Sequence, residues 1–147
     1  MDDLSHPVIL CIDDRATAAE TELLQAVLEK TGYRALTVSS ANRALELFHH
    51  HEIDLVLAEQ RVPTGIRDCS VAELLKRVKP DVPIAIYTAD WTQSPEDLRV
   101  ADVFITKLVS VEELLGTIKR LLDHRLHHDE RMTERVQSDY ALGRFAA

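Results

Sequence analysis

Short apolar runs alternate along the chain with longer segments in which apolar residues recur every three or four positions. The apolar runs fall at residues 8–12, 35–38, 53–58, 83–87 and 102–107. Runs of this length with few polar interruptions are typical of strands that are buried on both faces of a sheet. The segments between them have the spacing of amphipathic helices. The pattern therefore predicts strands that alternate with helices.

The helical segments carry start signals. Ser70 and Ser110 each stand three residues before a glutamate, which is the capping-box pattern of a helix start. Ser94 and Pro95 predict a fourth helix, and it must be short because the fifth strand soon follows. The apolar stripes of these helices include Leu23, Val71, Leu74, Leu75, Val78 and Val111. Five alternations predict a doubly wound α/β fold, with a parallel sheet in the order 2-1-3-4-5 and helices on both faces.

The length of the chain bounds the number of domains. Its 147 residues, 46% of them hydrophobic, are enough for one domain with a core and few for two. We expect this domain to occupy residues 1–122. Charged residues interrupt the apolar stripe of residues 123–147. We expect this tail to be either a helical extension or disordered.

Charge and cysteine content exclude several classes of function. A net charge of −8 works against binding to nucleic acids or to anionic lipid. No apolar run is long enough to span a membrane, and the N-terminus lacks the basic start of a signal peptide. The two cysteines, Cys11 and Cys69, do not suggest a disulfide framework. We therefore expect a cytoplasmic protein.

Polar residues follow four of the predicted strands directly. Asp13 and Asp14 end the first strand, Glu59 the third, Thr88 the fourth and Lys107 the fifth. The carboxyl ends of parallel strands meet at one edge of a doubly wound sheet, where ligand sites lie. We therefore expect these five side chains to form one site.

The residues at these strand ends also carry a resemblance. The matching segments are Ile12-Asp13-Asp14, Asp54-Leu55-Val56-Leu57 with the acid and Pro63 that follow, Thr88-Ala89, Lys107, and the framework segments 28–33 and 44–48. Through them the chain resembles, over residues 7–122, the receiver domain of two-component response regulators. This family belongs to the CheY-like superfamily and has a flavodoxin-like sheet of the order predicted above.

The resemblance implies a role for each acid. In this family an aspartate at the end of the third strand accepts a phosphoryl group, with Mg²⁺ held by an acid pair. By position, Glu59 stands at the phosphoacceptor position, and Asp13 and Asp14 correspond to the metal-binding acids. Arg61 would offer its backbone carbonyl to the metal. Mg²⁺ is the only cofactor that the resemblance implies.

The resemblance also implies roles on the fourth and fifth strands. Thr88 and Lys107 correspond to the residues that contact the phosphoryl oxygens. Phe104 occupies the position of the aromatic residue that switches when these contacts form, although it lacks a hydroxyl group.

Four departures from the family argue against phosphorylation. Glu59 is one methylene longer than aspartate, and in-line attack requires positioning at the ångström level. Arg15 stands where the family has a third acid. Its cation, or that of Lys107, competes with Mg²⁺ for Asp13 and Asp14. Leu108 replaces a proline, and the loop from Pro63 to the third helix is long. These departures indicate a pseudo-receiver with a degenerate site, in which Glu59 either mimics phosphorylation or is inert.

The sequence thus predicts a stand-alone signalling protein that is not an enzyme and acts through protein contacts. The expected partners are a sensor kinase, a regulator or a downstream target, and a homodimer would form through the fifth helix or the tail. The alternative is a Mg²⁺-dependent response regulator that accepts a phosphoryl group. A flavin or nucleotide binder is disfavoured, because none of the four glycines follows the first strand.

Overall fold

The computed structural model describes residues 6–89 and 99–125 of the chain. Five parallel strands form one sheet in the order β2-β1-β3-β4-β5. The strands are β1 (Val8–Ile12), β2 (Arg34–Val38), β3 (Leu55–Ala58), β4 (Ile84–Thr88) and β5 (Val103–Thr106). The helices are α1 (Ala18–Lys30), α2 (Ala41–His50), α3 (Val71–Val78) and a C-terminal helix at residues 111–125. The predicted fold class and strand order are confirmed.

Two predicted features lie outside the described residues. One is the start of the fourth helix at Ser94 and Pro95, and the other is the tail from residue 126 onwards. Within the described part of the chain, no helix combines the length and the apolar character needed to cross a bilayer.

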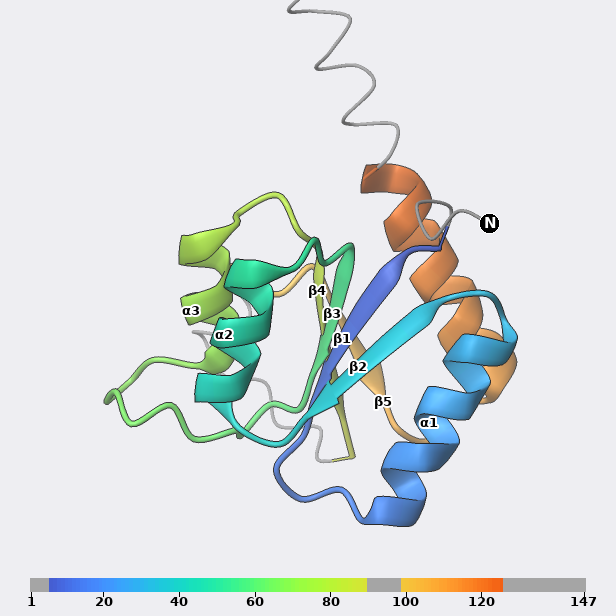
Figure 1. Ribbon diagram of the computed structural model, residues 1–147, viewed down its shortest axis with the longest axis horizontal. Helices are drawn as coiled ribbons and strands as arrows, with labels where there is room; N and C mark the ends of the chain where they lie inside the picture. The colour runs from blue at the N-terminus through green and yellow to red at the C-terminus, as the bar shows by residue number, and fades with distance from the viewer. Residues whose placement is uncertain (1–5, 90–98, 126–147) are drawn as a thin grey trace, which may run out of the picture.

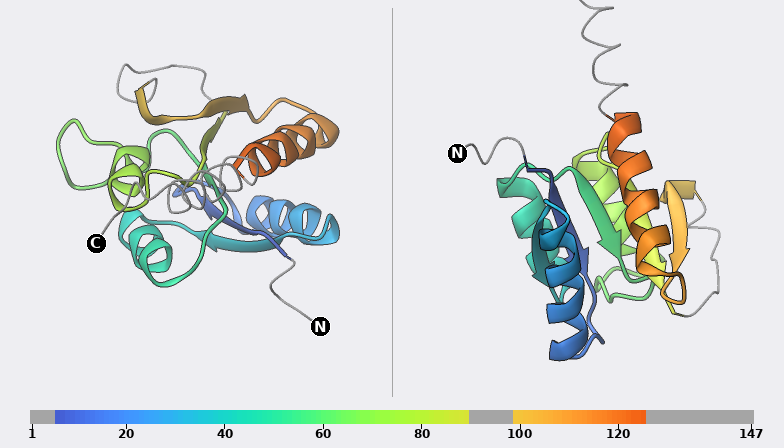
Figure 2. Two further views of the ribbon diagram at one scale, coloured as in Figure 1. Left: turned by 90° about the horizontal axis from the view of Figure 1, so that it is seen from above. Right: turned by 90° about the vertical axis from the view of Figure 1, so that its right-hand side faces the viewer.

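Helices cover both faces of the sheet, as Figures 1 and 2 show. One face packs against α2 and α3 around Phe48, and the other packs against α1 and the C-terminal helix around Leu28 and Ile118. Successive strand side chains point to opposite faces, so that Leu10 joins the first core cluster and Cys11 the second. This burial on both faces explains why the strands read as continuous apolar runs.

Side-chain caps fix where the helices begin. The hydroxyl of Ser70 accepts a hydrogen bond from the backbone N–H of Glu73 at 3.2 Å, and Ser110 accepts one from Glu113 at 3.1 Å. Both predicted helix starts are thus correct. Thr17 and Ser40 cap α1 and α2 in the same way, and these caps were not predicted.

Three apolar residues that were expected on inner stripes are exposed. Val78 is 40% exposed because it is the last residue of α3. Leu23 is 67% exposed and Val111 49% exposed. Both of these line a pocket between α1 and the C-terminal helix, so the space beside them is open.

Asp54 fastens the edge of the sheet that lies opposite the predicted site. Its Oδ2 accepts a hydrogen bond from the backbone N–H of Val8 at 2.8 Å. Its Oδ1 pairs with Arg125 at 3.2 Å, and the same Arg125 nitrogen donates to the carbonyl of Ile53. One carboxylate thus ties the start of β1 to the start of β3 and to the C-terminal helix.

We expect Asp54→Ala to lower the free energy of unfolding by about 1–3 kcal/mol, because it leaves the backbone N–H of Val8 without its acceptor and a half-buried guanidinium without its carboxylate partner. Urea denaturation measures this change. Asp81→Ala, at an exposed carboxylate, is the control and should change stability by less than about 0.5 kcal/mol. Equal effects of the two substitutions would contradict this role.

Candidate functional site

The strand ends bring four of the predicted side chains to one edge of the sheet. Asp13 follows β1, Glu59 follows β3, Thr88 ends β4 and Lys107 follows β5. Backbone hydrogen bonds continue the ladder past the strands. The N–H of Glu59 donates to Ile12 at 2.8 Å, and the N–H of Lys107 donates to Thr88 at 2.9 Å. The positions of these side chains are therefore fixed by the sheet itself.

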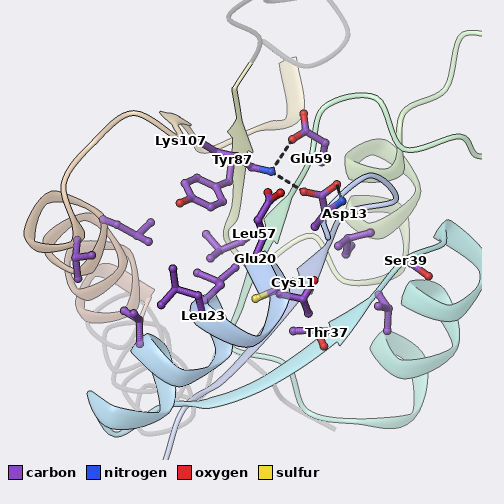
Figure 3. A pocket seen from close by; sticks show the side chains of 18 of the residues that line it. Cys11, Asp13, Glu20, Leu23, Thr37, Ser39, Leu57, Glu59, Tyr87 and Lys107 are labelled. Atoms are coloured by element: carbon purple, nitrogen blue, oxygen red, sulfur yellow. Dashed lines mark hydrogen bonds and ion pairs between the residues drawn. The ribbon is translucent and has the colours of Figure 1, made fainter. Parts of the chain in front are cut away.

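Lys107 joins two carboxylates that come from different strands. Its ammonium lies 2.5 Å from Oδ2 of Asp13 and 3.1 Å from Oε2 of Glu59 (Figure 3). The three side chains are 23%, 20% and 13% exposed for Lys107, Asp13 and Glu59, so solvent screens them only in part. We call Asp13, Glu59 and Lys107 the acid–lysine network.

The other oxygen of Glu59 is engaged as well. Oε1 accepts a hydrogen bond from the hydroxyl of Thr88 at 2.5 Å and one from the backbone N–H of Gln60 at 3.1 Å. Thr88 is 1% exposed, so its hydroxyl bonds to protein groups and not to water. Glu59 therefore binds both Thr88 and Lys107, the two residues that the sequence predicts as phosphate contacts.

Asp13 also uses both of its oxygens. Oδ1 accepts hydrogen bonds from the backbone N–H groups of Arg15 at 2.8 Å and Ala16 at 3.1 Å, while Oδ2 accepts from Lys107. The first pair of bonds shapes the turn that leads from β1 into α1. Among the described residues, Arg15 reaches Asp13 through its backbone, and its exposed side chain forms no ion pair there. The cation beside Asp13 is that of Lys107.

Burial and ion pairing act in opposite directions on these groups. Burial alone would raise the pKa of Asp13, but the hydrogen bonds from Lys107 and the backbone and the charge of Lys107 outweigh it, and the pKa falls below its ordinary value. Burial alone would lower the pKa of Lys107, but the bonds to Asp13 and Glu59 raise it above its ordinary value. Asp13 and Lys107 are therefore both charged at neutral pH.

Tyr87 is a further member of the site that was not predicted from the sequence. The ammonium of Lys107 lies 5.5 Å from the centre of its ring, within the range of a cation–π contact. Burial raises the pKa of its hydroxyl, against the charge of Lys107. Strand alternation could have predicted the direction of its side chain. Tyr87 precedes Thr88 in β4, so it points to the opposite face of the sheet.

Three other predicted residues keep their roles as predictions. Asp14 and Arg61 have exposed side chains and lie within two residues of Asp13 and Glu59 along the chain. Phe104 on β5 is half-buried and packs against the core cluster on the side of α2 and α3.

The acids do not form a ready metal site in this arrangement. Among residues 6–89 and 99–125, no group of three or more His, Cys, Asp or Glu side chains is placed to hold a metal ion. Both oxygens of Asp13 are taken, and one of them by Lys107. A Mg²⁺ ion ligated by Asp13 and Asp14 would have to share Oδ2 of Asp13 with the ammonium of Lys107 or displace it.

The two pKa shifts predict a pH window for the network. The lowered pKa of Asp13 gives stability that is fully present above the ordinary value of 3.8 and is lost as the pH falls through the folded-state value. The raised pKa of Lys107 gives stability that is present below 10.5 and is lost as the pH rises through the folded-state value.

We therefore expect Asp13→Asn to cost about 1–2 kcal/mol of unfolding free energy at neutral pH, and this difference from the wild type should vanish in acid. Asn keeps the acceptor for Arg15 and Ala16 but loses the charge. Urea denaturation at a series of pH values measures the difference. Asp14→Asn, at the exposed neighbour, is the control and should change stability by less than about 0.5 kcal/mol at neutral pH, and a difference that persisted in acid for Asp13→Asn would contradict the ion pair.

The fold and the site define a class of protein: a doubly wound domain with acids, a hydroxyl and a lysine at the switch edge of its sheet. Residues 9–119 match the family described as the response regulator receiver domain. The chain belongs to this family.

Solved structures agree with this assignment. A CheY-like receiver domain protein from Methanospirillum hungatei is 25% identical, with a TM-score of 0.71, and the match covers 84% of this chain and 98% of that one. The response regulator TrrA from Thermotoga maritima, solved in complex with Mg²⁺ and BeF, is 28% identical, with a TM-score of 0.68, and the match covers 79% and 99%. NtrX from Brucella abortus, at 21% identity and a TM-score of 0.75, shares the fold, and the match covers 87% of this chain and 30% of NtrX.

Proposed function

We propose that this receiver domain signals through protein contacts and does not accept a phosphoryl group. One observation carries the proposal: the carboxylate of Glu59 itself binds the Thr88 hydroxyl and the Lys107 ammonium. These are the groups that receiver domains direct at a phosphoryl group. A phosphodonor would therefore meet a site in which Glu59 already occupies the groups that would bind the phosphoryl oxygens.

The length of the Glu59 side chain supports the same proposal. An aspartate at this position would hold its carboxylate one methylene nearer the backbone. Phosphoryl transfer depends on an in-line approach of the attacking oxygen, and a displacement of about 1 Å costs on the order of a hundredfold in rate. On this proposal, the longer side chain of Glu59 holds its oxygens away from the position of the nucleophile and nearer to that of the phosphoryl oxygens.

We further propose that Glu59 mimics phosphorylation and is not merely inert. An inert carboxylate could point to solvent, whereas Glu59 is 13% exposed and engages Thr88 and Lys107 at the same time. Phe104, at the position of the switch aromatic, is half-buried against the core. On this proposal the domain holds its signalling surface in one state, and regulation comes from the supply of its partners. These partners are cytoplasmic proteins such as a sensor kinase, a regulator or a downstream target.

A Mg²⁺ titration tests the proposal. By isothermal titration calorimetry we expect no saturable binding of Mg²⁺ to the wild type at low millimolar concentration, because Lys107 holds Asp13. Lys107→Ala, which frees one oxygen of Asp13, is the matched variant and should bind Mg²⁺ measurably. Tight binding by the wild type would overturn the proposal.

A Mg²⁺-dependent receiver that accepts a phosphoryl group is the second candidate. The presence of Asp13, Asp14, Thr88 and Lys107 favours it, as does the similarity to TrrA, whose structure contains Mg²⁺ and BeF. This function would require Lys107 to leave Asp13 and Thr88 to leave Glu59 before the donor binds. Covalent labelling of the wild type, described in the Discussion, separates the two candidates.

A further inference from the structure

A pocket of about 590 Å³ opens beside the acid–lysine network, between α1 and the start of the C-terminal helix (Figure 3). Its floor is the sheet, where it includes Cys11 of β1 and Leu57 of β3. Its walls include Leu24 and Val27 of α1 and Leu114 of the C-terminal helix. Pockets of a few hundred Å³ with mainly apolar walls are the usual sites of small molecules in proteins.

The body of this pocket, which we call the α1 pocket, is apolar. Burial raises the pKa of the Cys11 thiol to about 12, so the floor carries no charge there at neutral pH. Leu23 of α1 and Val111 of the C-terminal helix both line the pocket and are 67% and 49% exposed. When an apolar ligand covers large apolar side chains that water contacts at the rim of a cavity, the free energy of the system falls.

One end of the α1 pocket is acidic. Asp13, Glu59 and Glu20 line it, and the ammonium of Lys107 is the cation among them. Glu20 is exposed at the first turn of α1, where its carboxylate accepts a hydrogen bond from Thr17. Arg43 lines the pocket as well, but it is paired with Glu46 at 2.9 Å. Three carboxylates beside one lysine leave an excess of negative charge at this end.

We infer that the α1 pocket binds a small molecule that has an apolar body and a protonated amine at one end. The apolar body would cover Leu23 and Val111, and the amine would lie at the exposed carboxylate of Glu20, the member of the three that Lys107 does not hold. A carboxylate-bearing ligand of the same size would bring like charges together. The inference does not depend on whether Glu59 accepts a phosphoryl group, because it rests on the carboxylate of Glu20 and on the apolar walls.

Three probes of equal length test the inference on the full chain: phenylbutylamine, phenylbutanol and phenylbutyrate. We expect saturable binding of the amine, with amide shifts in an NMR spectrum confined to α1, the C-terminal helix and the strand ends that line the pocket, those of β1 to β4. The alcohol should bind severalfold more weakly, and the carboxylate should not saturate. Equal binding of amine and alcohol, or no binding of the amine, would overturn the inference.

Variants at the rim separate this pocket from other surfaces. Leu23→Trp puts a larger side chain at an exposed position of the opening and should weaken binding of the amine by at least about tenfold. Glu20→Gln should bring the affinities of the amine and the alcohol closer together. Val78→Trp, at a 40% exposed position on α3, is the control and should leave binding unchanged.

A second copy of this chain is the rival occupant of the α1 pocket. Sedimentation at increasing protein concentration distinguishes it, because a dimer that Leu23→Trp abolishes would show that the opening is covered by protein and would overturn the inference. A monomer that binds the amine through the pocket would support it.

Discussion

Replacing Lys107 with methionine is expected to lower the free energy of unfolding by about 1–3 kcal/mol at neutral pH. Methionine keeps most of the length of the side chain but removes the charge, and with it the cation–π contact with Tyr87. Asp13 and Glu59, which are 20% and 13% exposed, would then lose the cation that they share. Because the loss of a partner from a half-buried pair leaves a charge poorly solvated, this substitution should be the most destabilising one at the site.

Urea denaturation measures this change, with Lys119→Met on the exposed side of the C-terminal helix as the control. A double-mutant cycle with Asp13→Asn shows whether the effect is specific. The two substitutions should be less destabilising together than the sum of their separate effects, because each removes the same interaction. Additive effects would show that Lys107 and Asp13 contribute independently.

Replacing Glu59 with aspartate is expected to increase the rate of phosphoryl acceptance by orders of magnitude. The shorter side chain withdraws its carboxylate from Thr88 and Lys107, which it binds at 2.5 Å and 3.1 Å in the wild type. The hydroxyl and the ammonium would then be available to a phosphodonor, and the carboxylate would stand where the attack takes place. The measurement is a time course of covalent labelling with a small phosphodonor and Mg²⁺.

Glu59→Gln is the matched control for this prediction. Glutamine keeps the length of the wild-type side chain and offers no nucleophilic carboxylate, so it should remain unlabelled. If Glu59→Asp also stayed unlabelled, the identity of residue 59 would not be what prevents phosphorylation. The ion pair of Asp13 with Lys107 and the exposed Leu108 after Lys107 would then be the features to examine.

Most of the fold could be predicted because the strands are buried on both faces. Runs such as residues 9–12 and 55–58 have no solvated side, so their apolar residues are continuous in the sequence. Polar residues then mark where each strand leaves the core. The site could be predicted for the same reason, since Asp13, Glu59, Thr88 and Lys107 each come directly after or at the end of a strand.

What the sequence could not show was the pairing of these side chains and the gap beside them. Which cation meets Asp13 depends on side-chain directions across the sheet, and the structure brings Lys107 there and leaves the side chain of Arg15 exposed. Leu23 and Val111 have the spacing of buried residues, and only the separation of α1 from the C-terminal helix exposes them. The contact of Tyr87 with Lys107 was not predicted, because a tyrosine in an apolar run is usually interpreted as a core residue.

The intact mass of the wild-type protein after incubation with a small phosphodonor and Mg²⁺ tests the central claim most directly. We predict no change in mass, because Glu59 occupies the Thr88 and Lys107 contacts that a phosphoryl group would need. Glu59→Asp in the same experiment shows whether the pocket is otherwise competent. A wild-type protein that gained the mass of one phosphoryl group, located on Glu59 or on a neighbouring acid, would contradict the account.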